Sequence, residues 1–264
     1  MNRIEEFYNK FNEDKRLKTR HGRVEYEVTM HYILKYIDEL KPNTIADIGA
    51  GAGAYTVPLL EKTDNIIAID VVRYNLGRLK QNAAKAMSNY EDILTCYKRD
   101  ARKLRDIKDN ISDMTLLLGP MYHLTTLEDR RKALKEAIRI TKSGGVILVA
   151  YIMNEYGVLM HGFEEHTILD DIKNGNVDDM YHINNEDKIY SFVRLEDIDK
   201  VNEGLQVRRE VIFSPDGAAN HFRPMLNSLS DEEFEVFIDY QKKISGRTDL
   251  LGAAAHTVDV LRVF

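Results

Sequence analysis

Short, continuously apolar runs alternate with helix-like stretches over most of this sequence, and this alternation restricts the possible folds more than any other feature. Apolar runs without polar alternation indicate strands buried on both faces, as in a parallel sheet. Such strands separated by helices are typical of a doubly wound α/β fold. The expected strands are Thr44–Ile48, Asn65–Ile69, Ile93–Tyr97, Asp113–Leu118 and Val146–Ile152.

The helix-like stretches carry apolar residues spaced three to four positions apart, which is the period of an amphipathic helix. They lie at Glu25–Leu40, Tyr55–Lys62, Val72–Met87 and Leu127–Thr141. Residues 154–190 are polar and show no clear strand. The remaining expected elements are a helix at Leu195–Asn202, a strand at Leu205–Phe213, a helix after Ser230-Asp231 and a last strand at Thr257–Phe264.

The overall composition argues against two classes of partner. The 264 residues include 37 Lys+Arg and 43 Asp+Glu, a formal net charge of −6, which offers no basic surface for a nucleic-acid backbone. The longest apolar run, Val146–Met153, is far shorter than the roughly 20 residues that span a bilayer. Cys96 is the single cysteine, and the histidines lack zinc-site spacing. We expect a cytoplasmic protein with no metal, no nucleic-acid partner and no membrane partner; the oligomeric state is not predicted.

The glycine-rich loop Asp47-Ile48-Gly49-Ala50-Gly51-Ala52-Gly53-Ala54-Tyr55 closes the first expected strand and opens the expected helix that follows. Glycines at such a turn let the backbone approach a ligand closely, because no Cβ intervenes. Taken alone, the loop also fits the dinucleotide fingerprint, since Gly49, Gly51 and Ala54 satisfy G-x-G-x-x-G/A. Asp70 follows at a distance that suits ribose binding in that interpretation too.

Acidic residues near the ends of three strands favour a different ligand. Asp47 ends the first strand region, Asp70 the second and Asp100 the third, so all three should line one crevice at the carboxyl ends of the strands. Three carboxylates suit a nucleoside that carries a cation better than one that carries a pyrophosphate.

With these motifs the sequence resembles the class I S-adenosylmethionine (SAM) dependent methyltransferases. The resemblance covers about residues 40–155 well and both ends more weakly. It is carried by the glycine loop, Ala68-Ile69-Asp70, Asp100-Ala101, Leu117-Leu118-Gly119-Pro120-Met121-Tyr122-His123-Leu124, and Lys142-Ser143-Gly144-Gly145 before the fifth strand.

This resemblance implies a Rossmann-like, doubly wound seven-stranded sheet with an antiparallel last strand, plus N-terminal helical and inserted cap segments. We expect one domain over residues 1–264, with its core at about 40–155 and 194–264 and cap elements at about 1–38, 154–190 and 214–250. The cofactor would be SAM and the product S-adenosylhomocysteine (SAH). The residues expected at the cofactor are Asp47, Gly49, Ala50, Gly51, Asp70, Val71, Asp100, Ala101, Leu118 and Gly119.

Methyl transfer from a sulfonium requires an oriented nucleophile and, for some acceptors, a base. His123 is the candidate base, because it follows the fourth strand on the crevice side and histidine titrates near neutral pH. Tyr8, His21, Tyr122 and Tyr151 are the candidate contacts to a small-molecule acceptor, with transfer to oxygen or nitrogen.

Two alternative functions stay open. An NAD(P)-dependent oxidoreductase would use the same loop, although the Tyr-x-x-x-Lys pair of one such family occurs nowhere in the chain. A non-catalytic SAM-binding protein would carry the same cofactor residues as an enzyme.

Overall fold

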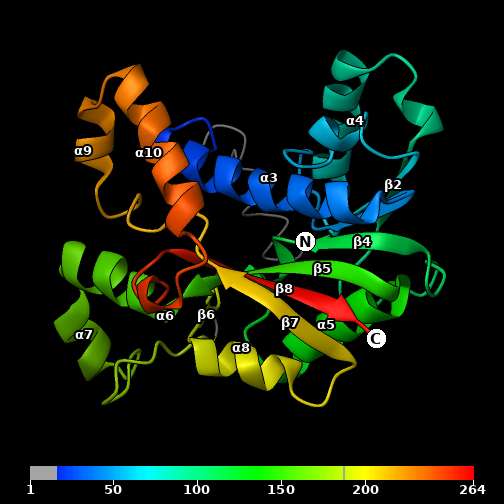
Figure 1. Ribbon diagram of the computed structural model, residues 1–264. Helices are drawn as coiled ribbons and strands as arrows, with labels where there is room; N and C mark the ends of the chain where they lie inside the picture. The colour runs from blue at the N-terminus through cyan, green and yellow to red at the C-terminus, as the bar shows by residue number, and fades with distance from the viewer. Residues whose placement is uncertain (1–16, 187) are drawn as a thin grey trace.

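The computed structural model describes residues 17–186 and 188–264, and its centre is a single twisted sheet (Figure 1). The strand order is β3-β2-β1-β4-β5-β8-β7, and β6 pairs with the end of β5. The strands are β1 Thr44–Ile48, β2 Asn65–Asp70, β3 Leu94–Lys98, β4 Ser112–Leu117, β5 Thr141–Met153, β6 Phe192–Val193, β7 Val207–Phe213 and β8 His256–Val263.

Strands β1 to β5 are parallel, whereas β8 runs antiparallel to both β5 and β7. The prediction of a Rossmann-like sheet with an antiparallel last strand is therefore confirmed. The chain leaves β1 toward β2 and β3 and later returns to β4 on the other side of β1. The carboxyl ends of β1 and β4 thus flank the switch point at which open α/β sheets bind ligands.

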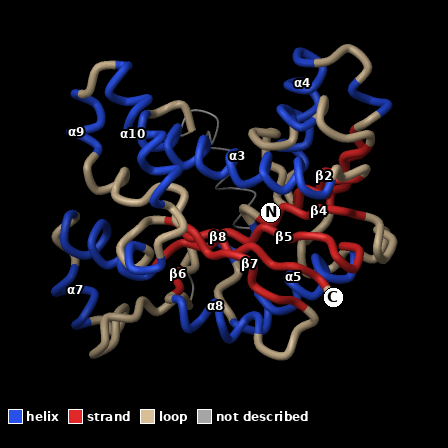
Figure 2. Tube along the Cα trace, in the orientation of Figure 1, coloured by secondary structure: helices blue, strands red, loops and turns tan. Residues whose placement is uncertain are grey.

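Helices cover both faces of the sheet (Figures 1 and 2). Core residues of α3, α4 and α10 pack on one face, and those of α5 and α8 pack on the other. The helices are α3 Arg20–Leu40, α4 Arg73–Ala86, α5 Leu127–Ile140, α6 Asn154–Gly157, α7 Ile168–Lys173, α8 Leu195–Asn202, α9 Arg223–Ser228 and α10 Asp231–Ile244. Shorter turns are η1 Val57–Leu59, η2 Tyr90–Asp92, η3 Pro120–His123, the π-helix η4 Val158–Glu164 and η5 Thr248–Leu250.

Helix α3 follows from local sequence signals. The Thr19 hydroxyl accepts from the Gly22 amide and caps its first turn, and Val24 and Val28 on its apolar face are fully buried. The helix ends at Lys41, whose φ of 46° lies in the left-handed region, directly before Pro42. Among the described residues 17–186 and 188–264, no helix is both long enough and apolar enough to cross a membrane.

The expected helix at Tyr55–Lys62 is wrong. Only the three-residue turn η1 forms there, because Pro58 supplies no backbone N–H to continue helical hydrogen bonding and the stretch ends soon afterwards. Strand β5 is longer than expected, since it begins at Thr141, within the expected helix, and includes the predicted Lys142–Gly145 turn. The two-residue strand β6 was not predicted.

Candidate active site

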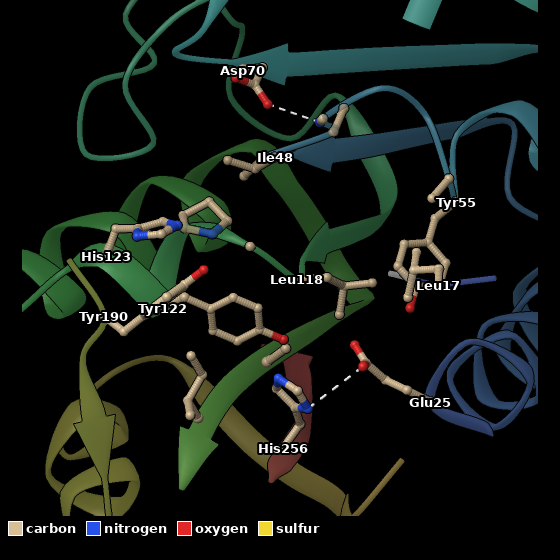
Figure 3. A pocket seen from close by; sticks show the side chains of 18 of the residues that line it. Leu17, Glu25, Ile48, Tyr55, Asp70, Leu118, Tyr122, His123, Tyr190 and His256 are labelled. Carbon is tan, nitrogen blue, oxygen red and sulfur yellow. Dashed lines mark hydrogen bonds and ion pairs between the residues drawn. The ribbon is translucent and has the colours of Figure 1, made fainter. Parts of the chain in front are cut away.

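A cavity of about 660 Å³ opens at the carboxyl ends of the parallel strands (Figure 3). This volume lies within the range of small-molecule sites. All ten residues expected at the cofactor line it: Asp47, Gly49, Ala50, Gly51, Asp70, Val71, Asp100, Ala101, Leu118 and Gly119. Four loops that are far apart in the sequence therefore meet in one place, as the acidic strand ends predicted.

The loop after β1 needs glycine for two separate reasons. Gly49 has φ +84°, and a Cβ there would lie 2.5 Å from Cδ of Pro120 in the loop after β4. Gly51 has φ +56°, and a Cβ there would meet nothing within 4 Å. Glycine at position 49 thus permits the two loops to pack at the switch point, whereas Gly51 leaves open space beside the backbone for a ligand.

Asp70 at the end of β2 holds the same loop in place. Its carboxylate accepts from the amide of Gly51 at 2.9 Å and from the amide of Val72 at 2.7 Å. The Asn75 side-chain amide also donates to the two carboxylate oxygens, at the longer distances of 3.4 and 3.5 Å. Since a carboxylate has about four acceptor positions, ligand hydroxyls could bind Asp70 in place of these long contacts. Burial raises the pKa of Asp70, and the hydrogen bonds from the two backbone amides and from the Asn75 side chain oppose that rise.

Asp47 lies behind the loop and is only 3% exposed. The Thr56 hydroxyl donates to its Oδ2 at 2.6 Å. Burial raises the pKa of Asp47 to about 6, with the Thr56 hydrogen bond acting against the rise and the nearby charge of Asp70 adding to it. Asp47 therefore supports the loop from within the protein more than it offers a charge to the cavity.

Asp100 follows β3 and is engaged by Arg102. The Arg102 backbone amide and guanidinium both donate to the Asp100 carboxylate, at 2.9 Å from the amide and 2.7 Å from Nη2. These bonds hold the pKa of Asp100 below its usual value. An ionised Asp100 could accept a hydrogen bond from a ligand amino group at the cavity edge.

The opposite wall holds two of the four predicted acceptor contacts. Tyr122 and His21 both line the cavity. Tyr8 lies outside the described residues. Tyr151 is not at the cavity: its side chain is 1% exposed and packs in the core on the other face of the sheet, so this prediction is wrong. Successive residues of a strand point to opposite faces of the sheet. The neighbours of Tyr151, Ala150 and Ile152, therefore line the cavity in its place.

His123, the predicted base, also lines the cavity, beside Tyr190 (Figure 3). Its Nδ1 lies 2.8 Å from the carbonyl oxygen of Ile189. Burial lowers the pKa of His123, and the bond to this carbonyl acts in the opposite direction. Burial thus makes this imidazole a weaker proton acceptor.

A polar network on the same wall was not predicted. His256 at the start of β8 lines the cavity, and its Nδ1 lies 2.7 Å from Oδ2 of Asp216 and 3.7 Å from Oε2 of Glu25. Asn220 donates to Asp216 at 2.8 Å and accepts from Arg223 at 3.0 Å. The network thus joins the loop after β7, the start of α9 and the first turns of α3.

The comparisons with known proteins agree with this geometry. Residues 46–149 match the family model described as a methyltransferase domain. This range covers the strands β1 to β4, most of β5, and the loops that form the cofactor side of the cavity. This part of the chain is therefore similar to a methyltransferase domain. The resemblance to class I SAM-dependent methyltransferases is confirmed for this domain, which supports the predicted enzyme class and cofactor.

Related proteins extend the likeness beyond the domain. A glycine/sarcosine N-methyltransferase from Parasynechococcus marenigrum is 27% identical over 132 residues, which are 50% of this chain and 45% of that protein. The chain thus matches about half the length of this curated relative.

Solved methyltransferase structures share the fold. The N-methyltransferase NodS from Bradyrhizobium japonicum, solved with SAH, aligns over 98% of this chain and 96% of its own, with a TM-score of 0.60 and 12% identity. Magnesium protoporphyrin IX methyltransferase from Synechocystis, also with bound SAH, covers 92% of this chain and 84% of its own, with a TM-score of 0.58 and 13% identity.

The missed network lies outside the matched methyltransferase domain. Its sequence signals were weak: Pro215-Asp216-Gly217 indicated only a turn, and His256 stood just before the expected last strand. The antiparallel register places His256 opposite Ile152 of β5 and so carries it to the cavity. Only that long-range pairing shows that the two segments meet.

Proposed function

We propose that this protein transfers the methyl group of SAM to an oxygen or nitrogen atom of a small-molecule acceptor and releases SAH. The observation that carries the proposal is the shared cavity, which has the glycine loop and two strand-end carboxylates on one side and aromatic and histidine side chains on the other. The proposal treats residues 1–264 as a single methyltransferase unit.

The cofactor side offers complementary groups for each part of SAM. The backbone at Gly49 to Gly51 would face the methionine part, and Asp70 would accept from both ribose hydroxyls. Asp100 would accept from the adenine amino group while the Ala101 amide donates to the ring. Open space at Gly51 and the position of Asp70 in the cavity lining support this placement.

The acceptor side supports a small, partly polar molecule. Tyr156, Tyr190 and Phe192 line it together with Arg223, whose Nε is buried and makes no hydrogen bond within the described chain. A pocket with aromatic walls and few polar groups can enclose and orient a metabolite-sized acceptor. The name of the glycine/sarcosine N-methyltransferase relative supports nitrogen as one acceptor atom.

The chemistry requires little beyond placement and exclusion of water. The sulfonium already activates the methyl carbon, so a nucleophile held in line with the C–S bond gains most of its acceleration from proximity and orientation. A side chain that takes a proton is needed only if the acceptor enters as an alcohol, a phenol or an ammonium ion.

The test is a thermal shift of the purified protein with SAM, SAH, NAD+ and NADP+ in separate samples. A ligand at 100 times its Kd adds about 2.7 kcal/mol to the stability. For a chain of this size, the melting temperature should then rise by about 5–10 °C. We expect this rise with SAM and SAH only. A rise with a nicotinamide cofactor alone would support the oxidoreductase alternative.

A second step separates an enzyme from a non-catalytic SAM-binding protein. The protein is incubated with SAM that carries a labelled methyl group and a panel of glycine, sarcosine, ethanolamine and catechol. Transfer of label to any member of the panel shows catalysis. SAH binding with no transfer to these or to a deproteinised cell extract would favour a binding protein.

A further inference from the structure

The polar network around His256 has the form of a catalytic dyad. Asp216 lies in the loop after β7, and its side chain is fully buried. Its Oδ2 accepts from Asn220, and its Oδ1 lies within hydrogen-bond distance of the His256 amide at 3.2 Å and the Ser214 hydroxyl at 3.4 Å. Several donors therefore hold this carboxylate in one orientation beside the imidazole.

This arrangement fixes the proton on one nitrogen of His256. An ionised carboxylate can only accept, so Nδ1 of His256, at 2.7 Å from Oδ2 of Asp216, must carry the hydrogen. In the neutral ring the lone pair then resides on Nε2. The hydrogen-bond network thus assigns the tautomer in which Nε2 can take up a proton.

The position of the ring suits that role. His256 begins β8 opposite Ile152, at the carboxyl end of β5, and its side chain is 13% exposed. Figure 3 shows its imidazole between Glu25 and Tyr122, with one ring nitrogen facing Glu25 and the other turned toward Tyr122. The Tyr122 and His256 rings lie 5.5 Å apart. Nε2 therefore lies on the acceptor wall of the cavity.

The surroundings also stabilise the protonated ring. The imidazolium formed by proton uptake would lie beside two carboxylates, Asp216 at 2.7 Å and Glu25 at 3.7 Å from Nδ1. Opposite charges at such distances favour the charged form of an ionisable group. His123 instead faces the carbonyl of Ile189, and burial lowers its pKa. Nδ1 of His256 thus faces carboxylates, whereas Nδ1 of His123 faces a neutral carbonyl.

We propose that His256 is the general base for the acceptor and that Asp216 is its positioning residue. This inference rests on the proposed methyltransferase function. The acceptor O–H or N–H bond breaks and its proton moves to Nε2 of His256. The electron pair of the acceptor atom forms a bond to the methyl carbon, the C–S bond of SAM breaks, and its electron pair returns to sulfur to give SAH. The imidazolium then releases the proton to water.

A metal site is the competing interpretation of the same residues. Glu25, Asp216 and His256 each offer a ligand atom, and these atoms lie within 4.8 Å of one another. The 2.7 Å contact between Nδ1 and Asp216 is a hydrogen-bond distance, and Asn220 donates to the same oxygen. A hydrogen bond between the two groups accounts for this geometry without a metal ion. The absence of a metal stays a prediction, which the chelation experiment below tests.

The first experiment needs no known acceptor. The protein is labelled with ¹⁵N-histidine, and the two ring nitrogens are observed by NMR at about pH 9, where an ordinary histidine is neutral. The His256→Gln variant identifies the signal of His256 by its disappearance. We expect a protonated Nδ1 and an unprotonated Nε2, and a change of tautomer in Asp216→Asn. A protonated Nε2 in the native protein would overturn the proposal.

The second experiment measures transfer to whichever members of the acceptor panel the native protein methylates. His256→Gln should lower kcat by roughly 100-fold or more, within the usual range for a general base, and leave the Kd for SAH within about threefold. His31→Gln, an exposed substitution on α3 away from the cavity, is the matched control and should retain native kcat. His123→Gln is compared in parallel.

The outcomes separate this inference from the proposed function. Native-like kcat in His256→Gln, or loss of turnover in His123→Gln alone, overturns the role of His256 but leaves the methyltransferase intact. Loss of native activity on chelation, restored by a divalent metal, also overturns it. No SAH binding by the native protein refutes the function and this inference together. If the native protein binds SAH but methylates no member of the panel, the tautomer of His256 measured by NMR decides whether the inference stands.

Discussion

Gly51 tests the cofactor loop at the scale of one residue. Gly51→Ala places a Cβ in the open space that we assign to SAM, at a φ of +56°. We expect a stability loss of about 1–2 kcal/mol from the backbone alone. The Kd for SAH should rise by at least about tenfold, equivalent to ~1.4 kcal/mol, because the methyl group occupies ligand space. Calorimetric titration with SAH measures the change.

Gly144→Ala is the matched control for this substitution. Gly144 has a φ of +79°, its added Cβ would also meet nothing within 4 Å, and it lies at an exposed position near the start of β5, outside the cavity lining. It should lose similar stability and keep native SAH affinity. Equal SAH affinity in the two variants would contradict the placement of the cofactor at Gly51.

Asp47 makes a pH-dependent contribution to stability. Its folded-state pKa of about 6 exceeds the ordinary value of 3.8, so the folded state holds this proton more tightly than the unfolded chain does. Its contribution therefore declines as pH rises from about 4 through 6, by up to roughly 3 kcal/mol. Asp47→Asn removes this decline while an amide oxygen can still accept from Thr56.

The free energies of unfolding of Asp47→Asn and the native protein are compared by urea denaturation at about pH 4.5 and about pH 8. The difference between variant and native should shift in favour of the variant by about 2 kcal/mol at the higher pH. The exposed Asp64→Asn variant serves as the reference for general charge effects. A pH-independent difference for Asp47→Asn would show that Asp47 is not held at a raised pKa.

At the scale of elements, a buried ion pair joins the last two long strands. Arg209 of β7 donates to Asp259 of β8 through Nε at 2.7 Å and Nη2 at 2.9 Å, and the Asp259 side chain is fully buried. Asn202 of α8 donates to the same carboxylate at 2.7 Å. Arg209→Ala leaves a buried charge with one neutral donor, which should cost about 2–4 kcal/mol, since Arg209 is itself partly exposed.

Urea denaturation measures this cost, with Arg208→Ala as the control. Arg208 pairs with Glu210 on the surface and is 66% exposed, so its removal should change stability by less than about 0.5 kcal/mol. The double variant Arg209→Met/Asp259→Leu should recover much of the loss, because it removes both charges. Equal effects of the two arginine substitutions would mean that the buried pair contributes no more than an exposed one.

Elements with strong local signals could be predicted from the sequence, and those set by distant pairing could not. Strand β1 and helix α8 have the predicted bounds, because a continuous apolar run and an amphipathic period define them. Strand β6 exists only through its pairing with Ile152 and Met153 of β5. Tyr151 lies on a strand that is buried on both faces, so its sequence shows no alternation of apolar and polar residues. The sequence therefore does not indicate toward which face of the sheet the Tyr151 side chain points.

The same distinction holds for the candidate site. Its cofactor side is built from residues directly after strands, so strand order and glycine chemistry predict where they meet. Its acceptor side is built from α3, the loop after β7 and the start of β8, which are separated by up to 231 positions between Glu25 and His256. No local pattern indicates that such segments adjoin, and the Glu25, Asp216 and His256 group therefore emerged only from the structure.

At the scale of the whole molecule, ligand binding should protect several distant segments at once. The cavity joins residues 49–53, 70–72, 99–102 and 118–122, which lie on different loops of one rigid sheet. Local opening of such loops exposes their amides, and a ligand that bridges them must reduce opening in all of them together. Hydrogen–deuterium exchange with and without SAH should therefore show coincident protection in the four segments.

The α8–β7 edge of the sheet provides an internal reference, because no residue of either element lines the cavity in the described chain. Its exchange should change little, apart from any overall gain in stability. SAH protection confined to residues 49–53 would indicate that the ligand contacts the glycine loop alone, as a phosphate-like group would, and would contradict the ribose and adenine positions assigned to Asp70 and Asp100. Coincident protection would instead show that one ligand spans the carboxyl ends of β1 to β4, because only such a ligand can couple the opening of loops that the sheet holds apart.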